Sequence, residues 1–395
     1  MRGARKTRFP AASNRAGRVQ MPIIPTVAGW IAETPGTISL GQGVVHYGPP
    51  PAALRKIPAF LKNAAHHRYL PDAGLPRLRK AFEEKLRAEN GIDAAFGRRI
   101  LVTAGANQGF VNALLCVCDP GDEIILLSPY YFNHEMAVGL AGCRAVCVSS
   151  DLNYQPRLAA IEAAVTARTR ALVTVSPNNP AGVVYSPDAL LAINRLCADR
   201  GIYHVSDEAY EYFTYDGAEH CSPGSFGAEH TISLFSMSKS YGMASWRVGF
   251  LVVPGHLFDD VMKIQDTVII CAPAVSQAVA LGALEEGRRY CARRLPGIAR
   301  VRERMLAAFS RIPDLLTVPP SRGAFYFLVK VHTSMDALTL AERLIREHKI
   351  AVIPGETFGV GRGCYLRISY GNLASEAVLE GVKRLVRGMK AIVGG

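Results

Sequence analysis

Residues 236–250 read SMSKSYGMASWRVGF, and this stretch is the most informative part of the chain. It follows an apolar run, Thr231–Phe235, that predicts a buried strand. Lys239 therefore lies just beyond a strand end, between two serines, and Arg247 follows eight positions later. The pattern predicts a lysine amine held beside phosphate-binding groups, because hydroxyls and a guanidinium donate strong hydrogen bonds to phosphate oxygens.

A primary amine beside a phosphate site is what pyridoxal phosphate (PLP) requires, because its aldehyde condenses with a lysine amine. Two other interpretations of the lysine exist. Ser-x-x-Lys also opens the active-site helix of penicillin-recognising serine enzymes, but the chain lacks their Lys-Thr-Gly element. Taken alone, so short a motif is as often found around a solvated surface lysine as around a catalytic one. The rest of the sequence is therefore needed to choose between these interpretations.

Two further strand ends carry polar residues. The apolar run 171–174 leads into Ser-Pro-Asn-Asn-Pro, which exposes Asn179 to a cleft above the sheet or forms an ordinary Asn-Pro turn. The run 202–205 leads into Asp207 and Tyr210. Asp207 suits a helix cap or a metal site, but a buried carboxylate also keeps a PLP pyridine nitrogen protonated. Tyr210 would then donate to the cofactor phenolic oxygen from the side opposite Asn179.

The chain resembles the class I and II aminotransferases of PLP fold type I in the order of four motifs. These are Asn-Pro-x-Gly, then Asp-x-x-Tyr, then Ser-x-Ser-Lys with an arginine eight residues later, and finally a late arginine. The resemblance runs from about residue 38 to 393 and leaves out only the N-terminal tail. Each motif is weak by itself, whereas their joint order is specific.

The resemblance implies a role for each motif residue. Lys239 would carry the cofactor, Asp207 would bind its pyridine nitrogen, and Asn179 and Tyr210 would bind its phenolic oxygen. A strand-to-helix turn at 103–108 offers backbone N–H groups to the phosphate, although without the resemblance a plain tight turn is favoured there. The implied phosphate ligands are Ser236, Ser238, Arg247, Gly105, Ala106 and Asn107.

Four more positions follow from the same resemblance. Tyr131 matches the aromatic residue that stacks on the pyridine ring, with adjacent Tyr130 as the competing assignment. Tyr69 matches the tyrosine that reaches the phosphate of the neighbouring subunit, which implies a homodimer with shared active sites. Arg367 matches the arginine that binds the substrate α-carboxylate, and Gly43 would add a backbone contact to that carboxylate.

The predicted function is a PLP-dependent aminotransferase that moves an amino group between an L-amino acid and a 2-oxo acid in a ping-pong sequence. The lysine amine that the substrate displaces from the cofactor would shuttle the proton. A PLP lyase or cyclising enzyme of the same fold is the alternative, because the same cofactor contacts serve those reactions. A non-catalytic PLP-fold regulator is a remote third class, since no DNA-binding domain precedes the fold.

Composition agrees with an intracellular enzyme. At 395 residues and 49% hydrophobic content, the chain is long enough for one large and one small domain. It has no run of 18 apolar residues, so no membrane span is predicted. Nine cysteines, scattered through apolar runs without Cys-x-x-Cys pairs, predict reduced thiols in a cytoplasmic protein and no metal site.

The net charge of +12 does not predict nucleic-acid binding. Much of the excess lies in residues 1–20, a basic tail that we expect to be disordered or to form an arm on a dimer partner. An organelle transit peptide is the minority interpretation of the tail. A second basic stretch, 288–304, predicts a helix with a solvated face.

The fold class predicted is α/β, with a mostly parallel seven-stranded sheet between helices and a smaller α+β domain. Apolar runs of strand length recur near residues 100, 124, 145, 171, 203, 232 and 249, and the later part predicts strands at 325–329 and 364–369 around a helix at 335–348. The expected division comprises a tail at 1–20, an arm that is part of the small domain at 21–50, a large PLP-binding domain at 51–287 and a small C-terminal domain at 288–395.

Substrate choice depends on a loop that departs from the family pattern. Where many members have Gly-x-Pro-Asp, this chain reads Gly-Val-Val-His-Tyr at 43–47. His46 and Arg322 are the only local cations predicted to reach a substrate side chain. The predicted pocket wall is otherwise apolar or aromatic, so neutral amino donors are expected to outrun aspartate. The wall residues predicted are Val44, Val45, Tyr47, Tyr131 and Phe325.

Overall fold

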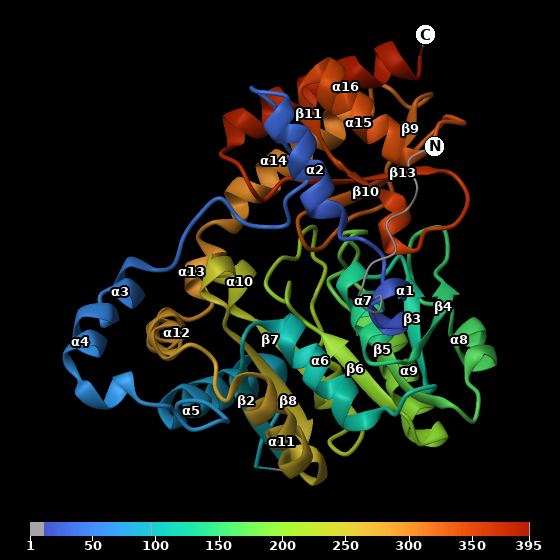
Figure 1. Ribbon diagram of the computed structural model, residues 1–395. Helices are drawn as coiled ribbons and strands as arrows, with labels where there is room; N and C mark the ends of the chain where they lie inside the picture. The colour runs from blue at the N-terminus through green and yellow to red at the C-terminus, as the bar shows by residue number, and fades with distance from the viewer. Residues whose placement is uncertain (1–11, 96, 395) are drawn as a thin grey trace, which may run out of the picture.

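The computed structural model describes residues 12–95 and 97–394 (Figure 1). Its centre is a seven-stranded sheet in which β8 runs antiparallel to both neighbours and all other pairs are parallel. All seven predicted strands are therefore confirmed, and so is the mostly parallel sheet. In spatial order the strands are β2 (Arg98–Thr103), β8 (Gly249–Pro254), β7 (Thr231–Ser236), β6 (Tyr203–Asp207), β5 (Thr169–Val175), β3 (Glu123–Ser128) and β4 (Arg144–Ser149).

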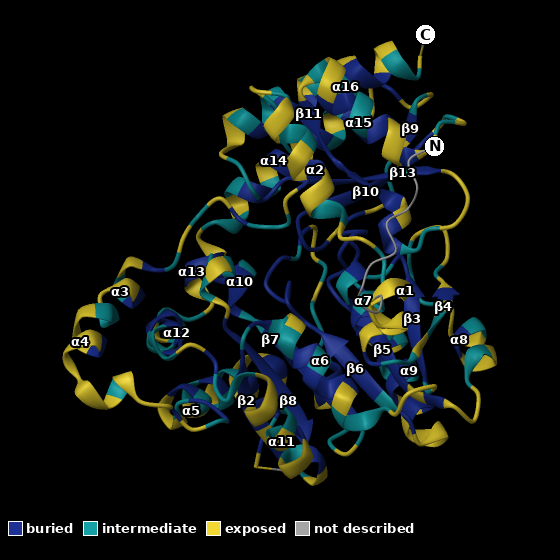
Figure 2. Ribbon diagram, viewed as in Figure 1, coloured by how far each residue is buried: buried dark blue, intermediate teal, exposed yellow. Residues whose placement is uncertain are grey.

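Helices cover both faces of this sheet, because successive side chains of its strands point alternately into two apolar cores. In β3, Ile124 and Leu126 pack with α6 and α7, whereas Ile125 and Leu127 pack with α8 and α9. Figure 2 shows the strands as the buried centre of this part of the molecule. The helices are α5 (Pro76–Lys85), α6 (Ala106–Val117), α7 (Phe132–Leu140), α8 (Leu158–Ala164), α9 (Pro187–Arg200), α11 (Phe258–Ile269) and α12 (Ala274–Glu286).

A second, antiparallel sheet of order β12-β13-β10-β9 lies above the first in Figure 1, with helices packed on it. The predicted strands at 325–329 and 364–369 and the helix between them are confirmed to within two residues at every end. The elements are α14 (Leu295–Phe309), β9 (Leu316–Thr317), β10 (Tyr326–Val331), α15 (Ala337–His348), β11 (Ile350–Ala351), β12 (Ile353–Pro354), β13 (Cys364–Ser369) and α16 (Ser375–Ile392).

The basic stretch at 288–304 differs from its prediction. It forms two helices, α13 (Arg289–Ala292) and α14, because Pro296 has no backbone N–H and starts a new helix instead of continuing one. Its face is not uniformly solvated either. Arg302 is buried, donating from Nη2 to Asp216 at 2.8 Å and from Nε to the Ser321 carbonyl at 2.8 Å.

The N-terminal region crosses from one sheet to the other. Strand β1 (Ile38–Ser39) pairs in parallel with β11, which joins it to the C-terminal part of the chain. The prediction of a disordered tail is wrong for its last residues, because they form α1 (Asn14–Arg18) and Gln20 binds Glu135 and Thr357 of its own subunit at 3.0 Å. Residues 1–11 of that tail lie outside the described residues. The helices here are α1 (Asn14–Arg18), α2 (Ile23–Glu33), α3 (Pro51–Leu54) and α4 (Lys56–Lys62).

Short helical turns complete the chain, and one of them, α10, carries Lys239. Within residues 12–95 and 97–394, no helix has the length and apolar character needed to cross a membrane. The short elements are η1 (Ala64–His67), η2 (Leu86–Asn90), η3 (Pro223–Ser225), α10 (Met237–Ser240), η4 (Ala244–Trp246), η5 (Gly255–Leu257) and η6 (Gly355–Phe358).

Candidate active site

A cavity of about 190 Å³ lies at the carboxyl ends of the parallel strands. Every residue predicted to bind the cofactor or the substrate α-carboxylate lines it except Gly105 and Tyr69. The topology explains this convergence, since the carboxyl ends of β3, β5, β6 and β7 share one edge of the sheet. Antiparallel β8 brings its amino end, and with it Arg247, to the same edge.

Lys239 lies in α10, which begins directly after β7. The Ser236 hydroxyl accepts a hydrogen bond from the Ser238 backbone N–H at 3.1 Å and so caps this short turn. The Lys239 ammonium donates to the Gly43 carbonyl and lies 5.8 Å from the centre of the Tyr210 ring. Burial, reinforced by the nearby positive charge of Arg367, lowers the pKa of Lys239 to about 8.

A low lysine pKa has a direct chemical consequence. Only the neutral amine is a nucleophile or a base, and at a pKa of about 8 a useful fraction is neutral at physiological pH. Lys239 therefore supplies a reactive amine that lines the cavity.

Asp207 ends β6 and is 5% exposed. Its carboxylate accepts from the Ala209 backbone N–H at 3.0 Å, and His134 Nε2 lies 3.1 Å from its second oxygen. His134 is buried at the start of α7 and stacks near Phe110, with ring centroids 4.1 Å apart. These contacts orient the carboxylate toward the cavity.

Sequence reasoning missed His134. A signal was present, because His134 lies three residues after Tyr131 in a segment already assigned to the pocket. Nothing local indicated that its ring would meet Asp207, which is distant in the sequence.

Arg367, from β13, is 2% exposed and joins three parts of the chain. Nη1 donates to Asn179 Oδ1 at 2.9 Å and Nη2 donates to the Gly41 carbonyl at 2.6 Å. Its Nε has no hydrogen-bond partner among the described residues. A buried guanidinium that lines a cavity is suited to a carboxylate ligand.

Gly105 is required by the packing of Arg247. A Cβ at Gly105 would collide with the Arg247 guanidinium, and its φ of +82° is a backbone conformation that favours glycine. Arg247 is held by the carbonyls of Ala244 at 2.8 Å and Ala104 at 3.2 Å. Helix α6 begins at the next residue, Ala106, without a side-chain cap, so its first N–H groups are free to meet an anion.

The structure brings Tyr131 to the cavity and leaves Tyr130 outside it. Tyr130 instead packs so closely on Gly359 that a Cβ there would collide with its ring. Tyr69 is 82% exposed and does not line the cavity of its own subunit.

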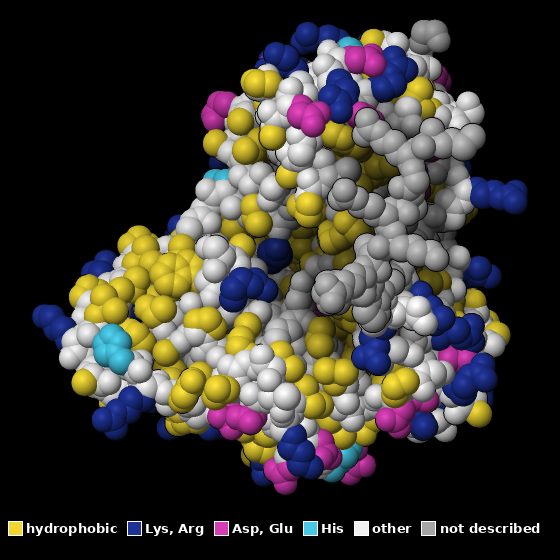
Figure 3. All heavy atoms as spheres, in the orientation of Figure 1, with side chains coloured by type: hydrophobic (Ala, Val, Ile, Leu, Met, Phe, Trp, Pro, Cys, Tyr) yellow, Lys and Arg dark blue, Asp and Glu magenta, His cyan; other side chains and the backbone are white. Residues whose placement is uncertain are grey.

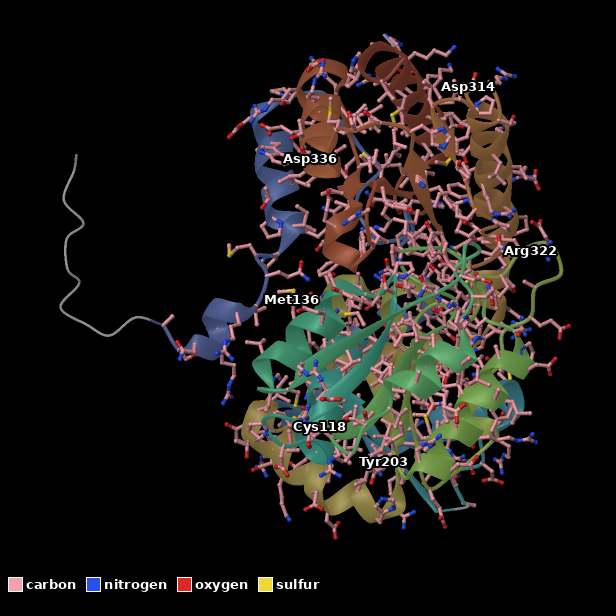
Figure 4. The ribbon with its side chains drawn as sticks, turned by 90° about the vertical axis from the view of Figure 1, so that its right-hand side faces the viewer. Cys118, Met136, Tyr203, Asp314, Arg322 and Asp336 are labelled. Atoms are coloured by element: carbon pink, nitrogen blue, oxygen red, sulfur yellow. The ribbon has the colours of Figure 1, made fainter. Side chains whose placement is uncertain are left out.

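The predicted pocket wall needs correction. Among the predicted wall residues, only Tyr131 lines the cavity. Phe325 instead packs in the core beside Tyr210, with ring centroids 5.3 Å apart. Neither predicted cation lines it. His46 faces the Gly371 carbonyl at 3.3 Å, and Figure 4 shows Arg322 at the edge of the molecule, where it borders a different depression. The lining residues that the sequence did not reveal are Ile24, Gln42, Phe132, Val175, Ala209 and Tyr326.

The fold and the site together define an α/β protein with a reactive lysine at the edge of its sheet. Residues 35–385 match the family model described as aminotransferase class I and II. The chain belongs to this family and is an aminotransferase.

Individual relatives carry related activities in their names. The chain is 34% identical to an aromatic aminotransferase of Arabidopsis thaliana over 98% of both chains. It is 34% identical to the aspartate/prephenate aminotransferase of Thermus thermophilus, over 84% of this chain and 87% of that one. Among solved structures, a single mutant of the Thermus thermophilus aspartate aminotransferase matches 96% of this chain and 100% of its own with a TM-score of 0.89 and 30% identity.

Proposed function

We propose that the cavity binds PLP and that this aminotransferase takes its amino group from neutral L-amino acids. The observation that carries the proposal is the pairing of a buried lysine of lowered pKa with a buried carboxylate in one cavity. An acid paired with a cationic ring nitrogen stays ionised despite its burial.

The residues present fit that cofactor. Lys239 would hold its aldehyde, Asp207 its pyridine nitrogen, and Asn179 and Tyr210 its phenolic oxygen, while Tyr131 would stack on the ring. Uncapped N–H groups at the start of a helix and a guanidinium beside them suit a phosphate. The phosphate ligands proposed are Gly105, Ala106, Asn107, Ser236, Ser238 and Arg247.

When bound, PLP supplies an electron sink that stabilises negative charge at the substrate α-carbon. Side chains of the protein would bind the substrate and move the proton. Arg367 and the Gly43 backbone would bind the α-carboxylate and thereby orient the α C–H bond. Lys239, released as a neutral amine, would take up that proton and return it on the cofactor side.

The preference for neutral donors rests on the cations of the cavity. Among the described residues its lining holds three cationic side chains, Lys239, Arg247 and Arg367. All three have a role in the scheme above. A side-chain carboxylate in the pocket would have no cation left in its own subunit, and burying it unpaired is costly. Apolar Ile24 and Phe132 instead favour an aliphatic or aromatic side chain.

A donor panel tests this preference. We expect phenylalanine, leucine and methionine to outpace aspartate by at least about tenfold, because an unpaired buried charge costs more than about 1.4 kcal/mol. The measurement is the half-reaction, followed by the loss of the visible band of the bound cofactor without an oxo acid. Aspartate outpacing all three would contradict the proposal.

The same panel separates transamination from elimination. Without a 2-oxo acid a transaminase stops after one half-reaction, whereas a lyase continues to turn over. Continued formation of product without an acceptor would favour the lyase alternative.

We also propose a homodimer in which Tyr69 reaches the cofactor phosphate of the partner. The exposure of Tyr69 supports this, because a tyrosine is seldom so exposed unless a partner covers it. Helices α3 and α4 project beside it, with exposed Leu54 and Leu61. Figure 3 shows hydrophobic side chains gathered over these helices.

Hybrid dimers test the shared site. Tyr69→Phe is expected to weaken cofactor binding about tenfold by removing one hydrogen bond to a charged group. Mixing it with Lys239→Ala protomers, under conditions of subunit exchange, should create one native site per hybrid dimer and restore activity at low cofactor concentration. Tyr203→Phe, a tyrosine far from the cavity, is the matched control and should not weaken binding (Figure 4). An active monomer or absence of restoration despite exchange would refute the shared site.

The proposed domain division keeps residues 51–287 as the large domain and joins residues 21–50 to residues 288–395 as the small one. The pairing of β1 with β11 supports that join. We propose a cytoplasmic location as well, which the nine free cysteines support.

A further inference from the structure

Tyr326 is a buried tyrosine of the cavity that the scheme above does not use. Its hydroxyl lies 2.7 Å from the Tyr210 hydroxyl, a short phenol–phenol hydrogen bond. The two rings meet nearly edge to face, with centroids 5.5 Å apart at an interplanar angle of 78°. Tyr326 therefore contacts the residue proposed to bind the cofactor phenolic oxygen.

The direction of this bond follows from the hydrogens available. A hydroxyl has one hydrogen to donate and two lone pairs to accept. If Tyr210 donates its hydrogen to the cofactor, both of its remaining neighbours must donate to it. Asn179 Nδ2 does so at 3.4 Å, and Tyr326 at 2.7 Å is the closer donor.

Tyr326 is held in place for this task. A Cβ at Gly43 would collide with its hydroxyl, so that glycine leaves room for it. The guanidinium carbon of Arg367 lies 4.8 Å from the centre of its ring. Ring and hydroxyl thus make separate contacts, the ring to Arg367 and the hydroxyl to Tyr210.

Tyr326 keeps its proton in this environment. Burial raises its pKa to about 12, although the charge of Arg367 opposes the shift. The pKa of Tyr210 is also raised, chiefly by burial. Both hydroxyls therefore remain available as donors across the working pH range.

We propose that Tyr326 is a positioning residue that donates to Tyr210 and so makes Tyr210 a stronger hydrogen-bond donor to the phenolic oxygen of the cofactor. Hydrogen bonds in a buried chain polarise one another, so the outer phenol strengthens the inner bond. The inference rests on the proposed function, because it requires the cofactor to lie against Tyr210.

The pH titration of the cofactor visible band tests it. A donor to the phenolic oxygen stabilises its anionic form, so the bound chromophore loses its proton at a lower pH. Tyr326→Phe keeps the ring and removes the donor, and we expect the midpoint to rise by about half a pH unit. Tyr210→Phe should raise it further, by about one unit or more.

The double variant gives the decisive readout. If Tyr326 acts through Tyr210, then Tyr326→Phe should add no shift in the Tyr210→Phe background. A shift that persists there would overturn the proposal, and so would an unchanged midpoint in the single variant. Tyr370→Phe is the matched control, since its buried hydroxyl has no hydrogen-bond partner among the described residues, and the substitution should leave the midpoint unchanged.

Two further measurements keep the outcomes distinct. Should Tyr326→Phe not fold, Gly43→Ala places a methyl group against the Tyr326 hydroxyl and should raise the midpoint in the same direction. If the unaltered protein binds no PLP in equilibrium titration of the apoprotein, the proposed function fails. If it binds PLP but the midpoints do not follow the pattern above, only the role of Tyr326 fails.

Discussion

Lys239→Ala protein is expected to lose turnover by about 10⁴-fold or more, because the side chain is both the covalent anchor and the proton shuttle. Its buried amine, of lowered pKa, is the only lysine that lines the cavity among the described residues. The measurement is the amino-donor half-reaction, together with borohydride reduction and peptide mapping of the labelled lysine.

Lys239→Arg is the matched control for this result. Arginine keeps the positive charge but cannot be deprotonated, so it should be equally inactive while binding phosphate as before. A borohydride-reducible adduct in the Lys239→Ala protein would show that another residue anchors the cofactor.

Asp207→Ala protein is expected to keep some PLP but to lose about 10²–10³-fold in kcat, a typical effect of removing one preorganised charge from an active site. Without the carboxylate the ring nitrogen would no longer be held protonated, and the electron sink would weaken. The phosphate contacts and Lys239 are untouched, so cofactor binding should fall less than turnover. Measured kcat and cofactor affinity separate the two effects.

Asp207→Glu and His134→Phe serve as companions. The glutamate keeps a charge and should retain part of the activity. His134→Phe removes the 3.1 Å contact that orients the carboxylate and should cost less than removal of the charge itself. Near-normal turnover in Asp207→Ala would refute the assigned role.

The sequence by itself determined the large sheet and most of the cavity. Its strands are continuous apolar runs, a local signal that suffices when a strand is buried on both faces. The polar residues that follow those runs, such as Asn179, Asp207 and Lys239, meet at one edge because parallel strands end on the same side. The order of the motifs in the sequence therefore predicted that these residues belong to one site.

Local signals failed where a position depends on distant contacts. The end of the basic tail binds its own subunit through Gln20. Arg302 is buried and forms an ion pair with Asp216. A pattern of charges along the sequence indicates neither contact. His134 meets Asp207 only because α7 starts beside the end of β6.

Apart from Tyr131, the residues of the pocket wall were decided by the tertiary structure. Side chains alternate along extended backbone, so the single step from Phe325 to Tyr326, at the start of β10, determines which aromatic ring faces the cavity. Pairing of β10 with β13 sets Leu328 opposite Arg367 and turns Tyr326 to the cavity, while Phe325 enters the core. The sequence places these two aromatic residues side by side, and only the packing of the two sheets distinguishes them.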